Sequence, residues 1–325
     1  MISLHDLADR TIHGNLPSRT EVLSVMSDEL DVLEVVAAAA RVRRHFFGRR
    51  VTLNSLIPLQ RGSCPTDCSY CSQRMRSMSP SRRARWIDDV EAVEAVEQAV
   101  RQGAKRICLV AGGRGESDLD RLCHTIGVVR DRQPRVEICV GLGPLTSGQA
   151  DRLRAAGAHA YDHNLGTIER NHHDLSTLPT FADRVTTVAQ VASSGMSPSS
   201  GAVFGLGESD DHVVDVAFGL RGLFPDSVPV DFLTVPESRA LTPERCLRIL
   251  AVFRFCLPDV AVGIGNGREQ HLRGLQSLGL HVADSLYLGE RPDGVDAELR
   301  LIDDAGFVVD DVRDEIHDDL QLSLN

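Results

Sequence analysis

Apolar and polar residues follow two alternating patterns along most of the chain. Short apolar runs rich in β-branched residues, typical of buried strands, are separated by longer segments in which apolar residues recur every three or four positions, as on one face of a helix. The predicted strands are Val51–Pro58, Arg106–Ala111, Val136–Gly143, Ala160–Leu165, Gly201–Leu206, Pro229–Val235, Val260–Gly265 and His281–Leu288. The helical patterns lie near residues 88–103, 117–131, 147–156, 180–195, 209–222, 242–256, 268–279 and 296–306.

The order of these elements predicts the fold class. Strands that alternate with helices imply a parallel sheet whose crossovers are helical. Eight such repeats favour an α/β fold of the (β/α)₈ TIM-barrel type, in which the chemistry lies on the loops after the strands. An open doubly wound sheet is the alternative. The predicted domains are an N-terminal helical extension over residues 1–48, the barrel over 49–310 and an acidic tail over 311–325.

Composition and charge narrow the class of protein. The chain of 325 residues is 42% apolar and 25% charged, which suits a soluble protein with a large core. It has no signal-peptide pattern and no apolar run near the roughly 18 residues that span a bilayer, so we expect it in the cytoplasm. The net charge of −11 argues against nucleic acid as a partner. One basic stretch, either a solvated loop or a contact for an anion or a redox partner, contains Arg74, Arg76, Arg82, Arg83 and Arg85.

The clearest chemical signal is a group of three cysteines, Cys64, Cys68 and Cys71, just after the first predicted strand. Each iron of a four-iron cluster needs one external ligand, so three thiolates on one loop leave the fourth iron open to a substrate. Tyr70 would place an aromatic face beside that substrate. The alternatives are incidental thiols or a zinc site, but structural zinc usually needs a second CxxC pair, which this sequence lacks.

This CxxxCxΦC spacing resembles the signature of the radical S-adenosylmethionine (SAM) superfamily. Two further segments agree with it: a glycine pair after the second strand, and a GxIxGxxE-like segment that reads Gly201-Ala-Val-Phe-Gly-Leu-Gly-Glu208. The resemblance implies that the three cysteines hold a [4Fe-4S] cluster, which SAM completes. It also implies a set of residues that seat SAM, namely Tyr70, Gly112, Gly113, Asn164, Gly205 and Glu208.

Within the superfamily, residues 41–306 resemble biotin synthase. The matching segments include RRHFFGRRVTLN, CPTDCSYCSQ, RICLVAGG, EICVGLGPLT, YDHNLGT, TFADRVTTV, VFGLGES and GREQ. The resemblance implies radical insertion of sulfur between two unactivated carbons of dethiobiotin. It also implies a second, [2Fe-2S] cluster inside the barrel that supplies the sulfur.

The ligands of that second cluster are where this chain departs from the family, which uses three cysteines and one arginine. Cys108 and Cys139 match the first two cysteines, and the apolar residues on either side of each predict that both point into the barrel. The third cysteine is replaced by Ser199, and the arginine by Gly263. Two interpretations stay open: a second cluster on Cys108, Cys139 and Ser199, or two buried thiols that act as small apolar side chains.

The expected substrate positions also differ from the family. The family segment YNHNLDT reads YDHNLGT here, so Asn164 is kept while an aspartate becomes Gly166. Asp231 stands where the family has an asparagine that reads the ureido ring, and an ionised carboxylate offers only acceptors. Arg291 is a candidate contact for the substrate carboxylate.

The other histidines and cysteines are read as structural. His163 is expected to be a packed, hydrogen-bonded core residue, while His172 and His173 are expected on a surface loop. The remaining cysteines, which fall in helical stretches, are Cys123, Cys246 and Cys256.

The sequence therefore predicts a radical SAM enzyme that acts on a small molecule by sulfur insertion of the dethiobiotin-to-biotin type. The alternatives are lipoyl-type sulfur insertion, a radical rearrangement without sulfur, and a non-catalytic iron–sulfur protein. The resemblance implies a flavodoxin or ferredoxin as the electron donor and favours a homodimer.

Overall fold

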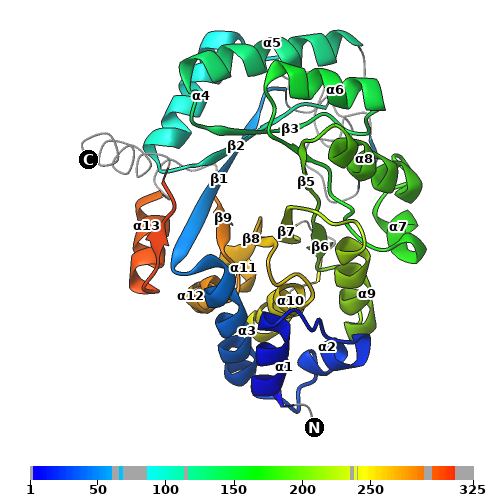
Figure 1. Cartoon of the computed structure of the whole chain (residues 1–325), viewed down its shortest axis with the longest axis vertical. Coiled ribbons are helices and arrows are strands. Elements are labelled where there is room, and N and C mark those ends of the chain that lie inside the picture. Colours follow the sequence, from blue (N-terminus) through cyan, green and yellow to red (C-terminus); the bar gives the residue numbers. More distant parts are fainter. Residues whose placement is uncertain are drawn as a thin grey trace. The chain divides into compact units, whose positions relative to one another are not determined.

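The structure, a computed structural model, describes residues 3–60, 66–68, 86–112, 116–234, 238–239, 241–288 and 295–311 (Figure 1). Contacts divide the chain into two compact units. The first unit comprises Met1–Val51, Leu165–Ile168 and Ser200–Val308, and the second comprises Thr52–Asn164, Glu169–Ser199 and Val309–Asn325.

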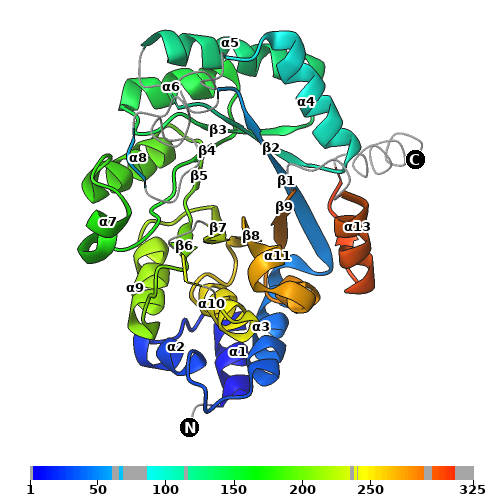
Figure 2. The same cartoon turned by 180° about the vertical axis from the view of Figure 1, so that it is seen from behind.

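The second unit contains a parallel sheet in which the strand order follows the chain. Its strands are β1 (Arg50–Pro58), which enters the unit at Thr52, β2 (Arg106–Val110), β3 (Glu137–Gly141), β4 (Ala160–Asp162) and β5 (Ser197–Ser199). Its helices are α4 (Asp89–Arg101), α5 (Glu116–Arg132), α6 (Ser147–Ala156), α7 (Glu169–Leu175) and α8 (Phe181–Ser193). Helices α4, α5 and α6 lie along one side of β2 and β3 (Figures 1 and 2). A helix between consecutive strands is what keeps these strands parallel.

The first unit combines the N-terminal helices with a second group of parallel strands, ordered β6-β7-β8-β9. The strands are β6 (Ala202–Phe204), β7 (Ser227–Phe232), β8 (Ala261–Ile264) and β9 (Ser285–Tyr287), and β10 (Val308–Val309) lies at the boundary of the units. The helices are α1 (Leu4–Ile12), α2 (Arg19–Val25), α3 (Val32–Phe47), α9 (Asp210–Arg221), α10 (Pro243–Cys256), α11 (Arg268–His271), a 3₁₀ turn (Arg273–Leu275), α12 (Gln276–Leu280) and α13 (Val295–Asp304).

The core of the first unit is built around α10, which is buried on all sides from Cys246 to Cys256. This buried stretch is mainly apolar but includes two arginines, and α10 packs against α2, α3 and α9. The Phe253 ring meets that of Phe204 edge-on at 5.8 Å. Arg248, also buried on this helix, donates to the backbone oxygens of Val25 and Leu30, at 3.0 and 2.5 Å, so its charge is satisfied within the core.

Helix starts in both units are fixed by local sequence. Four helices of the described part of the chain begin with a capping box, in which the cap side chain and the third helical residue each accept a hydrogen bond from the other's backbone N–H. These pairs are Ser18 with Glu21, Asp88 with Glu91, Thr146 with Gln149 and Thr180 with Asp183. One of them fixes the start of α8, the helix that carries Arg184.

The structure corrects several predicted elements. The predicted strand Gly201–Leu206 is shorter in the structure, where it is β6 (Ala202–Phe204). Strand β5 (Ser197–Ser199), which pairs with β4, was not predicted. The continuous helix predicted over 268–279 is wrong. It is broken at Arg273, whose φ of 52° lies outside the right-handed helical region. Helix α7 and strand β10 were not predicted. Among the described residues, no helix has the length and apolar content to cross a membrane.

Candidate active site

Cys68 is the one cysteine of the CxxxCxΦC group that lies within the described residues. It is buried, and its neighbour Asp67 anchors it to the turn after α7. The Asp67 carboxylate accepts hydrogen bonds from Ser176 Oγ at 2.8 Å and from the backbone N–H groups of Thr177 and Leu178 at 2.9 and 3.0 Å. Burial alone would raise the pKa of Asp67, but these hydrogen bonds outweigh it and hold the pKa well below its usual range. The carboxylate therefore stays ionised and holds the Cys68 segment in place.

A buried guanidinium contacts the Cys68 sulfur directly. Arg184, on α8, donates from Nη2 to Cys68 Sγ at 3.1 Å, from Nη1 to the Asn164 backbone oxygen at 2.7 Å and from Nε to His172 Nε2 at 2.9 Å. The Cys68 thiol in turn donates to Ser176 Oγ at 3.6 Å. Hydrogen bonds from a charged donor are stronger than those between neutral groups, so the Arg184 contact fixes the position of the sulfur. The Cys68 environment thus fits a ligand of an iron–sulfur cluster.

The two histidines of α7 were expected on a surface loop, and that expectation is wrong. Both lie in the helix, and only His173 is exposed, whereas His172 is 5% exposed and packs edge-on against Phe181 at 5.9 Å. Burial and the charge of Arg184 lower the pKa of His172. A neutral imidazole accepts the Arg184 hydrogen bond at Nε2, so His172 helps to orient the guanidinium that contacts Cys68.

Cys108 and Cys139 are neighbours on adjacent strands. They occupy paired positions on β2 and β3, both are buried, and their sulfur atoms are 3.5 Å apart. Ala160 completes the small cluster, and Val110 packs against it. The hydrogen bond with Cys139 and the burial both raise the pKa of the Cys108 thiol. Cys108 and Cys139 are therefore buried neighbours in the second unit.

Ser199 lies on the same side of the sheet as these cysteines and contacts a carboxylate. Its position on β5 pairs with Asp162 on β4, and Ser199 Oγ donates to Asp162 Oδ1 at 3.2 Å. His163, which follows Asp162 in the sequence, is buried as predicted, and its ring lies 6.4 Å from that of Tyr161. The Tyr161 hydroxyl donates to the Gly143 backbone oxygen at 2.6 Å, which fixes the end of β4.

The arginine of the family's second cluster has no place at Gly263. An ideal Cβ built on Gly263 would lie 2.8 Å from Ser285 Oγ and 3.3 Å from the Tyr287 ring. Any larger residue would have to displace β9 side chains. The full ligand set of the family is therefore absent from this chain, although two of its thiols are in place.

The GxIxGxxE-like segment of the first unit folds back on itself. Glu208 accepts hydrogen bonds from the backbone N–H of Gly205, at 2.9 Å, and of Leu206, at 2.9 Å. Gly205 has a φ of 122°, which favours glycine, and its ideal Cβ would meet Leu233 Cβ at 3.2 Å. Glu208 therefore holds this turn in shape through the turn's own backbone.

Asp231, the candidate substrate residue of the first unit, is engaged by its neighbour. Its Oδ1 accepts from the backbone N–H of Asn266 at 2.6 Å and from Asn266 Nδ2 at 3.0 Å. An ideal Cβ at position 265 would lie 2.2 Å from this oxygen, so Gly265 is required beside it. Burial raises the pKa of Asp231. The second oxygen, Oδ2, is in none of these contacts.

The remaining predicted residues divide into two groups. Gly112 is buried at the end of β2, and the cysteines read as structural lie on helices, with Cys123 half-buried on α5 and Cys246 and Cys256 buried on α10. The predicted residues that lie outside the described part of the chain are Cys64, Tyr70, Cys71, Gly113, Arg291 and the five arginines between 74 and 85.

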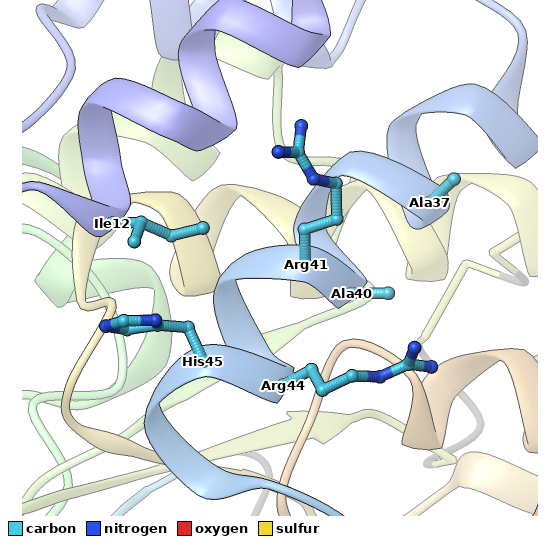
Figure 3. A pocket seen from close by; sticks show the side chains of 6 residues that line it. All are labelled: Ile12, Ala37, Ala40, Arg41, Arg44 and His45. Carbon is cyan, nitrogen blue, oxygen red and sulfur yellow. The ribbon is translucent and has the colours of Figure 1, made fainter.

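A separate cavity of about 510 Å³ lies on the N-terminal helices (Figure 3). Its lining residues come from α1 and α3 and are Ile12, Ala37, Ala40, Arg41, Arg44 and His45. Arg41 is already bound to Asp9 Oδ1, at 2.5 Å, and to His5 Nδ1, at 2.7 Å. The cavity contains none of the predicted site residues.

Sequence reasoning missed Arg184, Asp67 and Asp162. Arg184 lies in a segment that matches the family, at the end of its TFADR part. Its contact with Cys68 could not be predicted, because the two residues are 116 positions apart in the sequence. Asp162 differs from the asparagine of the family's YNHNLDT segment, and that change was the available signal.

Comparison with known protein families gives two matches that together cover most of the chain. Residues 61–218 match the Radical SAM superfamily, and residues 228–322 match the Biotin and Thiamin Synthesis associated domain. The chain is 50% identical to a biotin synthase of Streptomyces avermitilis over 94% of its own length and 82% of the relative's. A biotin synthase of Saccharopolyspora erythraea is 42% identical over 94% of this chain and 90% of the relative.

Solved structures show the fold. A methylornithine synthase superposes with a TM-score of 0.79 at 19% identity, covering 96% of this chain and 99% of that one. An FeFe-hydrogenase maturase, HydG from Carboxydothermus hydrogenoformans, gives 0.78 at 21% identity over 94% of this chain and 79% of that one. The predicted (β/α)₈ TIM-barrel fold class is thereby confirmed.

These matches confirm the predicted chemistry at the level of the family. They support a radical SAM enzyme of the sulfur-inserting type, with a [4Fe-4S] cluster and SAM as cofactors. The buried Cys68 with its arginine donor and the paired Cys108 and Cys139 are consistent with that chemistry. The chain belongs to the biotin synthase family of the radical SAM superfamily.

Proposed function

We propose that this chain converts dethiobiotin to biotin, with Cys64, Cys68 and Cys71 as the ligands of its [4Fe-4S] cluster. The observation that carries the proposal is the pair of buried thiols, Cys108 and Cys139, whose sulfur atoms lie 3.5 Å apart in the same unit as Cys68. Sulfur insertion needs a sulfide source besides the radical-generating cluster, and this pair is a binding site for one. The identity of 50% to a biotin synthase supports the choice of substrate.

The chain's own residues prepare the site in this proposal. When bound and reduced, the cluster and SAM supply a 5′-deoxyadenosyl radical that removes hydrogen from an unactivated carbon. Arg184 holds the Cys68 sulfur and the backbone after β4 at fixed positions, and His172 fixes the guanidinium. The residues that would seat SAM are Tyr70, Gly112, Gly113, Asn164, Gly205 and Glu208. The buried surroundings of Cys68 and Cys139 exclude water from reactive intermediates.

The test is an anaerobic assay of the reconstituted enzyme with dethiobiotin, SAM and a reducing system of flavodoxin and its reductase. We expect biotin together with 5′-deoxyadenosine and methionine. A Cys68→Ala variant should form neither biotin nor deoxyadenosine, because one ligand of the radical-generating cluster is removed. Deoxyadenosine without any biotin would refute the assigned substrate while leaving the radical chemistry intact.

A second candidate function, a radical reaction without sulfur insertion, is favoured by one observation. Gly263 has no room for the arginine of the second cluster, because Ser285 and Tyr287 fill that space. A chain without a second cluster would perform hydrogen abstraction or rearrangement only. It would show a single [4Fe-4S] cluster and no sulfide loss during turnover.

The same proposal places the enzyme in the cytoplasm as a homodimer that takes electrons from a flavodoxin or a ferredoxin. Size-exclusion chromatography with light scattering tests the dimer. Reduction rates with each donor test the electron source. A monomer, or a chain reduced by neither protein, would refute the corresponding part.

A further inference from the structure

Four side chains with metal-binding atoms lie in a row on one side of the second unit's sheet. Cys108 pairs with Cys139 across β2 and β3, Cys139 pairs with Ala160 across β3 and β4, and Asp162 pairs with Ser199 across β4 and β5. Paired positions on parallel strands point to the same side, and so do positions two residues apart on one strand. Figure 2 shows these strands in sequence across the unit.

The four side chains form two pairs, and each pair has the spacing of two ligands on one tetrahedral ion. Two thiolates at about 2.3 Å from a tetrahedral metal are about 3.7 Å apart, and Cys108 Sγ and Cys139 Sγ are 3.5 Å apart. Two oxygen ligands at about 2.0 Å are about 3.3 Å apart, and Asp162 Oδ1 and Ser199 Oγ are 3.2 Å apart.

The two pairs do not converge on one centre. Among the described residues, no group of three His, Cys, Asp or Glu side chains is arranged to hold a single metal ion. A mononuclear zinc site on Cys108, Cys139 and Asp162 is therefore disfavoured. Two separate pairs suit a dinuclear cluster, in which each iron takes two ligands from the protein.

We propose that Asp162 and Ser199 are the oxygen ligands that complete a second iron–sulfur cluster whose thiolate ligands are Cys108 and Cys139. The role of that cluster as a sulfur source rests on the proposed function, whereas the ligand set stands on these positions alone. Carboxylate and hydroxyl oxygens are harder ligands than thiolate, so the half of the cluster at Asp162 and Ser199 is held less tightly than the other half.

The departures from the family pattern agree with this assignment. The chain has serine where the family has its third cysteine, and aspartate where the family segment has asparagine, and these two residues contact each other. An acid has been gained beside the position where a thiolate was lost. The arginine position offers no replacement, because Gly263 faces Ser285 and Tyr287 at close range.

The experiment compares iron and sulfide content and Mössbauer spectra of anaerobically reconstituted full-length variants. The wild type should hold about six irons per chain, four in the radical-generating cluster and two in the second. Asp162→Asn keeps a hydrogen-bond acceptor for Ser199 but removes the charged ligand, so iron should fall to about four and the second signal should be lost. Asp174→Asn, an exposed acid on α7, is the matched control and should keep the wild-type content.

A complementary variant adds a softer ligand at the same place. Ser199→Cys should keep about six irons and make the second signal more resistant to chelators, because thiolate suits a sulfide cluster better than oxygen. Thermal unfolding of the iron-free wild type and Asp162→Asn should coincide, which separates loss of a ligand from loss of the fold. If Asp162→Asn does not fold, Ser199→Cys is the deciding variant. A second signal in Ser199→Cys that is no more resistant to chelators than that of the wild type would overturn the proposal.

Two results would overturn the ligand assignment outright. An Asp162→Asn enzyme with unchanged iron and an unchanged second signal would mean that Asp162 only accepts a hydrogen bond. A wild type with about four irons, or with zinc, would mean that there is no second cluster. Biotin formation by the same preparations is scored separately. If the wild type forms biotin and Asp162→Asn keeps the second signal, only the ligand assignment is refuted. If Asp162→Asn loses the second signal and the wild type forms no biotin, only the proposed substrate is refuted.

Discussion

Arg184 serves three acceptors of different chemical kinds: a thiol sulfur, a backbone carbonyl and an imidazole nitrogen. A guanidinium presents its N–H groups in a rigid planar fork, so all three contacts form without further ordering of the side chain. The side chain is 4% exposed, and removing a charged partner from a buried network leaves the other groups unsatisfied. Arg184 therefore positions the Cys68 sulfur, so replacing Arg184 should first weaken the binding of the cluster.

Replacing Arg184 by lysine should lower the iron retained by the radical-generating cluster. A lysine ammonium is a point charge that cannot reach Cys68, Asn164 and His172 together, so we expect at least a several-fold loss of iron after dilution into a chelator. The iron-free variant should lose about 2 kcal/mol of unfolding free energy. The measurements are iron per chain over time and urea unfolding of the iron-free protein.

The control for this prediction is the exposed Arg135, on the loop before β3. Arg135→Lys should match the wild type in both measurements. An Arg184→Lys enzyme that keeps its iron as long as the wild type would show that the Cys68 contact does not support the cluster.

At the scale of elements, helix starts are fixed by sequence at short range. The start of α2 is held by Ser18 and Glu21, with Arg10 of α1 bound to the same carboxylate. The backbone hydrogen bond from Ser18, followed by that from Arg10, lowers the pKa of Glu21 to about 2, from 4.5 in an unfolded chain. Since the folded pKa is depressed, the stabilisation is complete above pH 4.5 and is lost as the pH falls through about 2.

Replacing Glu21 by glutamine should therefore cost about 1 kcal/mol of unfolding free energy at neutral pH. The difference from the wild type should shrink as the pH falls from 4.5 towards about 2. Urea unfolding of the iron-free proteins across this range measures it, with the exposed Glu29→Gln as the control. A difference that stays constant over this range would mean that the charge of Glu21 contributes nothing.

The same scale explains which parts of the fold could be predicted. Strands such as β2 and β3 are continuous apolar runs, and α4 and α8 carry a capping box before an amphipathic pattern, so local sequence suffices. Strand β5 reads Ser197-Pro-Ser199 and has no apolar pattern; it is a strand because β4 offers it hydrogen-bond partners. Helix α7 carries two adjacent histidines, and a helix pattern of seven residues is too short to detect.

The candidate site, like the fold, could be predicted from the sequence only in part. The prediction that Cys108 and Cys139 point into the barrel rests on alternation along a strand, which is a local property. The contacts of Arg184 with Cys68 and of Asp162 with Ser199 join segments that only the fold brings together. Residue type alone gave no reason to select one arginine or one aspartate among many.

At the scale of the whole molecule, cofactor binding should be coupled to stability. SAM is expected to complete the [4Fe-4S] cluster through its open iron, so most of its affinity should depend on the presence of iron. A ligand that binds only the folded state stabilises it by about 2.7 kcal/mol at a concentration 100 times its Kd. For a chain of 325 residues this corresponds to a rise in Tm of about 4 °C.

We therefore expect SAM to raise the Tm of the iron-loaded enzyme by about 4 °C and that of the iron-free protein by less than about 1 °C. Anaerobic scanning fluorimetry with and without SAM measures both, and Cys68→Ala should behave like the iron-free protein because it lacks a proposed ligand of the cluster. Methionine and adenosine, added together as the separated parts of SAM, provide the ligand control. If the iron-free protein showed the full rise, protein contacts would carry the affinity for SAM by themselves, and the open iron would serve only in the cleavage of SAM.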